Sequence, residues 1–182
     1  MKNSLKEITL KNLAAFVSKQ LKKHKIDVVL TGGACVSIFS NNKYQSLDLD
    51  FVSAAVEYKP KAIIKAMREI GFERAAEGFF AHSNCPYIIE FIQPPLSIGR
   101  EPVKKIKNMK TKYGTIKLLN PTDCVKDRLA AYYFWDDLQS LEQAKMVTQK
   151  QKVDLKEVKR WSRVEGELKK YSQFIKQLEK EI

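Results

Sequence analysis

Residues 26–52 read IDVVLTGGACVSIFSNNKYQSLDLDFV, and this stretch decides the fold. The continuous apolar run at 28–30 predicts a strand that is buried on both faces. Gly32 and Gly33 then predict a sharp turn that opens a short helix, because glycine adopts backbone angles that other residues avoid. After a polar link, LDLDFV at 47–52 predicts a second strand. The segment is therefore predicted to form a strand, a glycine turn, a helix and a strand.

Two aspartates with one residue between them lie on the second predicted strand. Alternate side chains of a strand share a face, so Asp48 and Asp50 point the same way, while Phe51 and the leucines point the other way. Their Cα atoms are expected to lie about 6.6 Å apart. Ionised carboxylates this close repel each other unless a cation neutralises them. Oxygen ligands without nearby His or Cys favour Mg²⁺ or Mn²⁺ over Zn²⁺, so the pair predicts a site for one or two such cations.

The helix after the glycine turn has a start that suits phosphate. Its first amides have no partner within the helix, and its positive dipole end faces the turn. Each signal has a simpler interpretation when it is taken alone. Gly32 and Gly33 can form an ordinary tight turn, and Asp48 and Asp50 can lie on an exposed strand end. The chemical interpretation depends on finding both signals, in this order, within one short segment.

This order of motifs resembles the polymerase-β-like nucleotidyltransferase superfamily, through TGGACVSIF at 31–39 and SLDLDF at 46–51. The chain looks most like the AbiE-type toxin branch and related minimal nucleotidyltransferases. The resemblance implies an α+β fold, with a mixed sheet flanked by helices and followed by a helical bundle. It also implies Mg²⁺-dependent transfer of a nucleoside monophosphate from a nucleoside triphosphate to an acceptor. The metal ligands it implies are Asp48 and Asp50, and the nucleotide-binding residues are Thr31, Gly32, Gly33 and Ser46.

Gly33 departs from the family pattern, in which many active members have serine at the second turn position. Without that hydroxyl, one phosphate contact is lost. The rival hypothesis is therefore a nucleotidyltransferase fold without turnover, which binds RNA or a partner protein as an antitoxin-like module. The retained acidic residues favour the enzyme.

A third acid lies in YIIEFI at 87–92, which predicts another strand. Glu90 is unusual there, because a carboxylate among apolar side chains is rarely buried without a partner. If this strand lies beside LDLDFV, Glu90 joins Asp48 and Asp50. The resemblance then implies that Glu90 completes the metal site or accepts the proton of the acceptor hydroxyl, with Glu in place of the commoner Asp. The other interpretation is a glutamate that faces solvent on an edge strand.

From Asn120 onward the sequence predicts only helices, beginning at NPTD with Pro121 in the first turn. We therefore divide the chain into an α/β core at 1–119 and a helical bundle at 120–182. Lys126 resembles the lysine that AbiE-type proteins place early in their first C-terminal helix, which implies a contact with the nucleotide phosphates. The alternative is one exposed lysine among many.

Local signals predict the remaining elements. Ser4 and Glu7 form a capping-box pattern that predicts the start of the first helix. FERAAEGFFAH at 72–82 predicts a hairpin, and so does VKKIKNMKTKYGTIKLL at 103–119, whose lysines would form a cationic face. The Pro- and Gly-containing segment at 93–103 predicts a loop in the position of an active-site flap.

Composition and charge limit the class of protein. The 182 residues carry 33 Lys and Arg against 21 Asp and Glu, a formal net charge of +12. This excess suits a polyanion such as RNA, and a lysine-rich solvated surface explains it equally well. No apolar run approaches the length of a membrane span and no signal-peptide core begins the chain, which predicts a cytoplasmic protein without membrane contact. Three scattered cysteines and two distant histidines argue against a disulfide framework, a zinc site or a histidine-based triad.

The expected partners follow from the resemblance. They are a nucleoside triphosphate and an acceptor, for which RNA such as transfer RNA, a protein hydroxyl and a small molecule all stay open. The likeness to AbiE-type proteins adds a toxin-antitoxin or abortive-infection system, with a cognate toxin or antitoxin as a further partner.

Overall fold

The structure is a computed structural model that describes residues 5–54 and 58–180. Its elements in chain order are α1 (Leu10–Lys23), β1 (Val28–Thr31), α2 (Gly32–Phe39), β2 (Asp48–Ser53), α3 (Pro60–Arg68), β3 (Glu73–Arg74), β4 (Phe80–Ala81), β5 (Ile88–Ile92), β6 (Ser97–Ile98), β7 (Glu101–Pro102), β8 (Ile106–Thr111), β9 (Gly114–Leu119), α4 (Pro121–Trp135), α5 (Leu138–Lys150), α6 (Leu155–Val164) and α7 (Leu168–Glu179).

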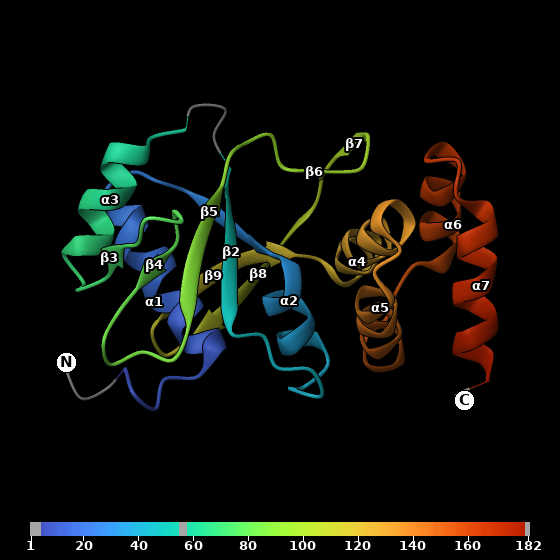
Figure 1. Cartoon of the computed structure of the whole chain (residues 1–182), viewed down its shortest axis with the longest axis horizontal. Coiled ribbons are helices and arrows are strands. Elements are labelled where there is room, and N and C mark those ends of the chain that lie inside the picture. The colour runs from blue at the N-terminus through green and yellow to red at the C-terminus, as the bar shows by residue number, and fades with distance from the viewer. Residues whose placement is uncertain (1–4, 55–57, 181–182) are drawn as a thin grey trace.

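A mixed seven-stranded sheet, in the order β3-β4-β5-β2-β1-β9-β8, forms the first part of the chain (Figure 1). Strand β1 pairs antiparallel with β2 and parallel with β9. On its other edge β2 pairs parallel with β5. The predicted mixed sheet flanked by helices is therefore confirmed.

Helices cover the sheet and then continue the chain beyond it. In the view of Figure 1, α1 and α3 lie on one side of β2 and β5, and α2 lies on the other side, followed by α4 to α7. The contacts agree, since α1 packs on β9 and α3, while α2 packs on β2, α4 and α5. The last strand ends at Leu119 and α4 begins at Pro121, so sheet and helices separate where we expected. The division into two domains stays a prediction.

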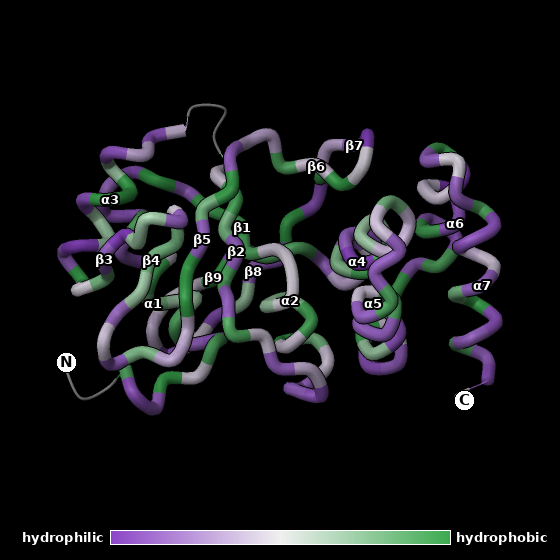
Figure 2. The backbone as a smooth tube through the Cα atoms, viewed as in Figure 1, coloured by the Kyte–Doolittle hydropathy of each residue, from purple (hydrophilic) through white to green (hydrophobic). Residues whose placement is uncertain are grey.

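The core forms where the apolar pattern places it. All four residues of β1 are buried, as expected for a strand covered on both faces. Leu49 and Phe51 of β2 are fully buried, so β2 presents its leucine and phenylalanine face to the core and its aspartate face away from it. Figure 2 shows hydrophobic residues along the central strands and hydrophilic residues along much of α3 and α7.

The first helix starts later than predicted. It begins at Leu10, where the Thr9 side chain accepts a hydrogen bond from the Asn12 backbone N–H at 3.3 Å. The capping-box prediction with Glu7 is therefore wrong, and its other residue, Ser4, lies outside the described residues. Leu5 is buried although it precedes the helix.

Both predicted hairpins form, as β3–β4 and β8–β9. The segment predicted to be a loop instead contains a small hairpin, β6–β7, that is fastened to α6. The Trp161 indole donates a hydrogen bond to the Ile98 carbonyl at 3.2 Å. The Arg100 backbone N–H donates a hydrogen bond of 2.9 Å to Oε1 of Glu165, which lies at the end of the same helix.

All three cysteines are free thiols, as expected. Among the described residues, no helix combines the length and the apolar character needed to cross a membrane. The cytoplasmic location stays a prediction.

Candidate active site

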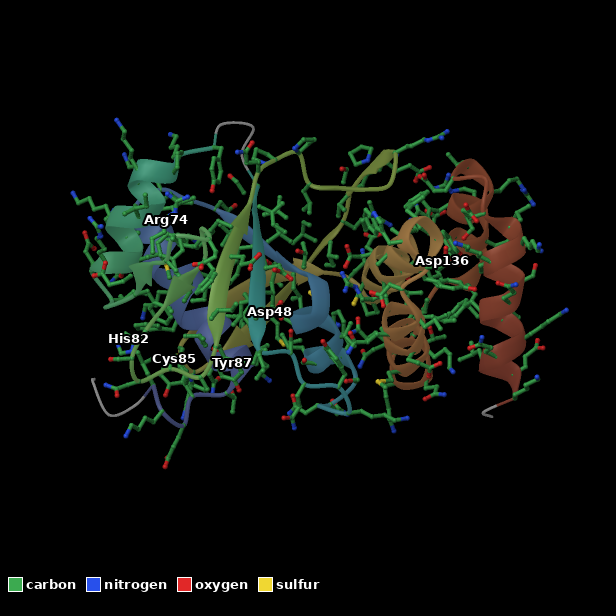
Figure 3. All side chains as sticks on the ribbon, viewed as in Figure 1. Asp48, Arg74, His82, Cys85, Tyr87 and Asp136 are labelled. Carbon is green, nitrogen blue, oxygen red and sulfur yellow. The ribbon has the colours of Figure 1, made fainter. Side chains whose placement is uncertain are left out.

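Three carboxylates share one face of the sheet. In the parallel pair β2–β5, Asp50 lies opposite Glu90 and Asp48 lies opposite Ile88. Residues opposite each other on neighbouring strands point to the same face, and so do alternate residues of one strand. Asp48, Asp50 and Glu90 therefore face the same side, and β5 lies beside β2 as the sequence predicted. Figure 3 labels Asp48 on β2 and Asp136 beyond the last turn of α4, with α2 between them in this view.

The acidity of Asp50 is shifted by its surroundings. Burial, followed by repulsion from the negative charges of Asp48 and Glu90, raises the pKa of Asp50 to about 7. The positive charge of Arg128 opposes these effects. The ionised form of Asp50 therefore destabilises the folded protein, and a bound cation would remove this destabilisation.

The glycine turn makes room for Asp50. Gly32 has φ of +64°, a left-handed angle that favours glycine, and a Cβ placed on it would overlap the Asp50 carboxylate. Thr31 precedes it and donates its hydroxyl to the Asp50 backbone carbonyl at 3.3 Å. The start of α2 and the acidic strand are thus packed against each other, with the Asp50 carboxylate at the positive end of the helix.

Gly33 makes room for a hydroxyl from another part of the chain. A Cβ on Gly33 would lie 2.9 Å from Ser46 Oγ and 3.3 Å from the ring of Tyr44. Ser46 is buried, its backbone N–H donates to Ser37 Oγ at 2.8 Å, and its own hydroxyl donates to Asp48 Oδ1. Ser46 therefore places a hydroxyl over the second glycine, in the space that a side chain at position 33 would need.

Arg128 of α4 is the cation that the structure brings toward the carboxylates. Its guanidinium donates to Asp127 Oδ2 at 2.6 and 3.0 Å and to Gln143 Oε1 at 3.4 Å. Its charge acts on Asp50, as does that of Asp127. The sequence showed Arg128 as one basic residue in a helix, and only the packing of α4 on α2 identifies its position.

Lys126 is the member of the predicted set that the structure does not bring to the carboxylates. It lies about 160° around α4 from Arg128, given a helical turn of 3.6 residues. Its Nζ is paired with Glu157 Oε1 at 2.7 Å and with Asp123 Oδ1 at 3.4 Å. These groups and Arg160 line a cavity of about 360 Å³. Lys126 is buried in this ion-pair network, which joins α4 to α6.

The ion-pair network predicts that part of the stability of the folded protein is lost at acid pH. Hydrogen bonds from Arg160 and then Lys126 lower the pKa of Glu157 from 4.5 to about 2. A lowered pKa in the folded state stabilises the protein above pH 4.5, and this contribution is lost as the pH falls toward 2. Glu157→Gln should therefore be less stable than the wild type at neutral pH, and the difference should shrink across this window. Denaturant unfolding measured at several pH values checks it. Glu101→Gln removes the other carboxylate that binds Arg160 and should show the same pH dependence. A stability difference between wild type and Glu157→Gln that stays constant with pH would contradict the lowered pKa of Glu157.

Asp48 and Asp50 provide some of the oxygen ligands that Mg²⁺ or Mn²⁺ needs, and the substrate phosphates would provide others. Across residues 5–54 and 58–180, no three His, Cys, Asp or Glu side chains lie close enough together to hold a metal ion between them. Mg²⁺ is commonly held by one or two carboxylates together with substrate phosphates. Asp48 and Asp50 meet that requirement, since they share a face and the Asp50 charge is destabilised without a cation.

Glu90 is exposed and also borders open space. It lines a cavity of about 440 Å³ between β5, the β3–β4 hairpin and the start of α3. Other residues that line this cavity are Tyr58, Arg74, Phe79 and Gln93.

Comparison with known proteins supports the fold. No protein-family model matches the chain, and no curated protein matches it. A solved structure that matches is that of an antigenic nucleotidyltransferase-like protein from Paracoccidioides brasiliensis, with a TM-score of 0.54, 75% of each chain covered and 14% sequence identity. At this identity the similarity shows the fold alone. The chain has a nucleotidyltransferase-like fold, as the sequence motifs implied, and the closer likeness to the AbiE-type branch stays a prediction.

Proposed function

We propose that this protein is a nucleotidyltransferase that moves a nucleoside monophosphate from a nucleoside triphosphate to an acceptor hydroxyl. The observation that carries the proposal is that Asp48, Asp50 and Glu90 lie on one face of the sheet, with the Asp50 carboxylate against the start of α2. A nucleotidyltransferase-like fold around these residues supports it.

Each group has a role that follows from its position. Asp48 and Asp50 would hold Mg²⁺ or Mn²⁺, which when bound neutralises charge on the triphosphate and the departing pyrophosphate. The amides at the start of α2, with Gly32 and Gly33, would bind phosphate oxygens. Ser46 orients Asp48 through its hydrogen bond and offers its hydroxyl at the same helix start.

Glu90 is suited to the acceptor side. It faces the same side of the sheet as the aspartates and borders the 440 Å³ cavity, so an acceptor hydroxyl that enters there would meet a carboxylate able to accept its proton. RNA, a protein or a small molecule could supply that hydroxyl. The toxin-antitoxin role and a cognate partner belong to this proposal through the resemblance alone.

The direct test measures pyrophosphate release from each of the four nucleoside triphosphates, with and without Mg²⁺. α-³²P-labelled triphosphate incubated with a total cell extract then reports which class of macromolecule or small molecule gains label. A protein that binds RNA in a salt-sensitive way, with neither metal-dependent triphosphate binding nor pyrophosphate release, would support the binding-module hypothesis instead.

Two basic residues of α4 provide a matched comparison. Arg128→Gln should lower pyrophosphate release about 10- to 100-fold, because one charged donor beside the triphosphate is lost. Lys126→Gln should leave the rate near that of the wild type and cost about 2–4 kcal/mol of stability, because it leaves Asp123 and Glu157 without their buried partner. Steady-state kinetics and denaturant unfolding of both variants check this. A lower rate for Lys126→Gln together with an unchanged rate for Arg128→Gln would instead support the phosphate-binding role that the sequence predicted for Lys126.

A further inference from the structure

An exposed apolar patch lies at the end of α4, formed by Phe134, Trp135 and Leu138. Their exposed fractions are 45%, 76% and 67%, and together they are half of the six large hydrophobic side chains exposed among the described residues. The other tryptophan, Trp161, is fully buried. Contiguous exposed apolar groups on a soluble protein commonly mark a binding surface.

Trp135 continues the helix face that reaches the carboxylates. Cys124, Arg128, Ala131 and Trp135 are spaced four, three and four residues apart, which places them in one stripe along α4. At its first end the stripe packs against α2, where the Cys124 thiol contacts that of Cys35. Two turns beyond Arg128, about 10.5 Å along the axis, the stripe becomes exposed at Trp135.

We propose that Trp135 and Phe134 form the surface on which the base of the bound nucleoside triphosphate stacks. This proposal rests on the proposed function, because it takes the triphosphate to lie at the carboxylates. A nucleoside triphosphate is elongated, so its base must bind at some distance from the groups that hold its phosphates. The stripe on α4 provides both, with Arg128 near the carboxylates and Trp135 farther along the same face. Phe134 lies beside the stripe and contacts the Trp135 ring.

The chemistry of the patch suits a base. The rings of Phe134 and Trp135 are already in edge contact, with centroids 6.3 Å apart and planes at 79°, so little ordering is needed before a flat ring stacks. Nearby acids are already engaged. Asp136 pairs with Lys170 at 2.8 Å, and Asp137 accepts hydrogen bonds at the start of α5 from Gln139 and Ser140.

Binding of MgATP, MgGTP, MgCTP and MgUTP, and of inorganic tripolyphosphate with Mg²⁺, tests the proposal by calorimetry and by tryptophan fluorescence. Trp135→Ala should weaken binding of the nucleotides about 5- to 150-fold, the usual value of one stacked base, and should leave tripolyphosphate binding unchanged. Trp135→Phe should restore most of the affinity. Fluorescence of the wild type should be quenched by the nucleotides and not by tripolyphosphate.

Several results would overturn it. Equal nucleotide affinity in the wild type and Trp135→Ala, with pyrophosphate release intact, would end the stacking proposal and leave the proposed function standing. Weaker binding of a short oligoribonucleotide but not of the triphosphates would assign the patch to the acceptor. A change of oligomeric state on sedimentation, with unchanged nucleotide affinity, would assign it to contact between copies of the chain. Absence of both binding and pyrophosphate release in the wild type would end both proposals.

Discussion

Asp50→Asn is expected to lower Mg²⁺-dependent pyrophosphate release by at least about 100-fold and, at the same time, to make the metal-free protein more stable. The activity falls because the side chain can no longer bind the cation as an anion. The stability rises because burial and the charges of Asp48 and Glu90 raise the pKa of Asp50 to about 7, so its ionised form is disfavoured in the folded state. Above this pH the neutral isostere removes a cost on the order of 1–4 kcal/mol.

Pyrophosphate release with saturating triphosphate, and denaturant unfolding at about pH 8 in chelator, measure the two effects. Asp27→Asn is the matched control, because Asp27 pairs with Lys117 and lies just before β1, at the opposite end of that strand from Thr31. It should leave the rate unchanged. Asp50→Asn with wild-type turnover would reject the assignment of the metal site, and a loss of stability would show that the Asp50 charge is compensated in the folded state.

Gly32→Ala is expected to cause a large loss of stability. A left-handed backbone costs a residue with a Cβ about 1–2 kcal/mol. The Cβ would also overlap the Asp50 carboxylate, which adds about 1–3 kcal/mol of packing strain. The measurement is the free energy of unfolding in denaturant.

Gly166→Ala separates the two causes. Gly166 also has a left-handed φ, of +84°, but a Cβ there would meet nothing within 4 Å, so only the backbone cost should appear. In an Asp50→Ala background the cost of Gly32→Ala should fall to the same value, because the carboxylate is gone. Equal costs for both glycines in the wild-type background would show that Asp50 does not press against the turn.

The parts of the fold that local patterns predict share a physical basis. The buried run of β1, the glycine turn and the alternation in β2 all arise from interactions between near neighbours in the chain and from exclusion of apolar groups from water. Glu90 was identified for the same reason, because the sequence alone shows a carboxylate among the apolar residues of a strand. The start of α1 was misplaced because Ser4 and Glu7 match the capping-box pattern, whereas Thr9 caps the helix in the structure.

Long-range packing explains what could not be predicted. Arg128 and Lys126 are two residues apart, and which of them turns toward Asp50 depends on the face of α4 that packs on α2. The hydroxyl of Ser46 reaches the space beside Gly33 because the chain folds back after α2, so the sequence alone suggested a missing contact at position 33. The hairpin β6–β7 forms because Trp161 and Glu165, more than sixty residues later, bind its backbone.

The sequence by itself determined the glycine turn, the paired aspartates and the strands that flank them, because hydrophobic alternation and glycine geometry act over a few residues. Only the tertiary structure decided which cation faces the acids, which hydroxyl lies over the second glycine and where an aromatic surface is left exposed. Those choices depend on which faces of distant helices are buried together, and burial is a property of the whole chain.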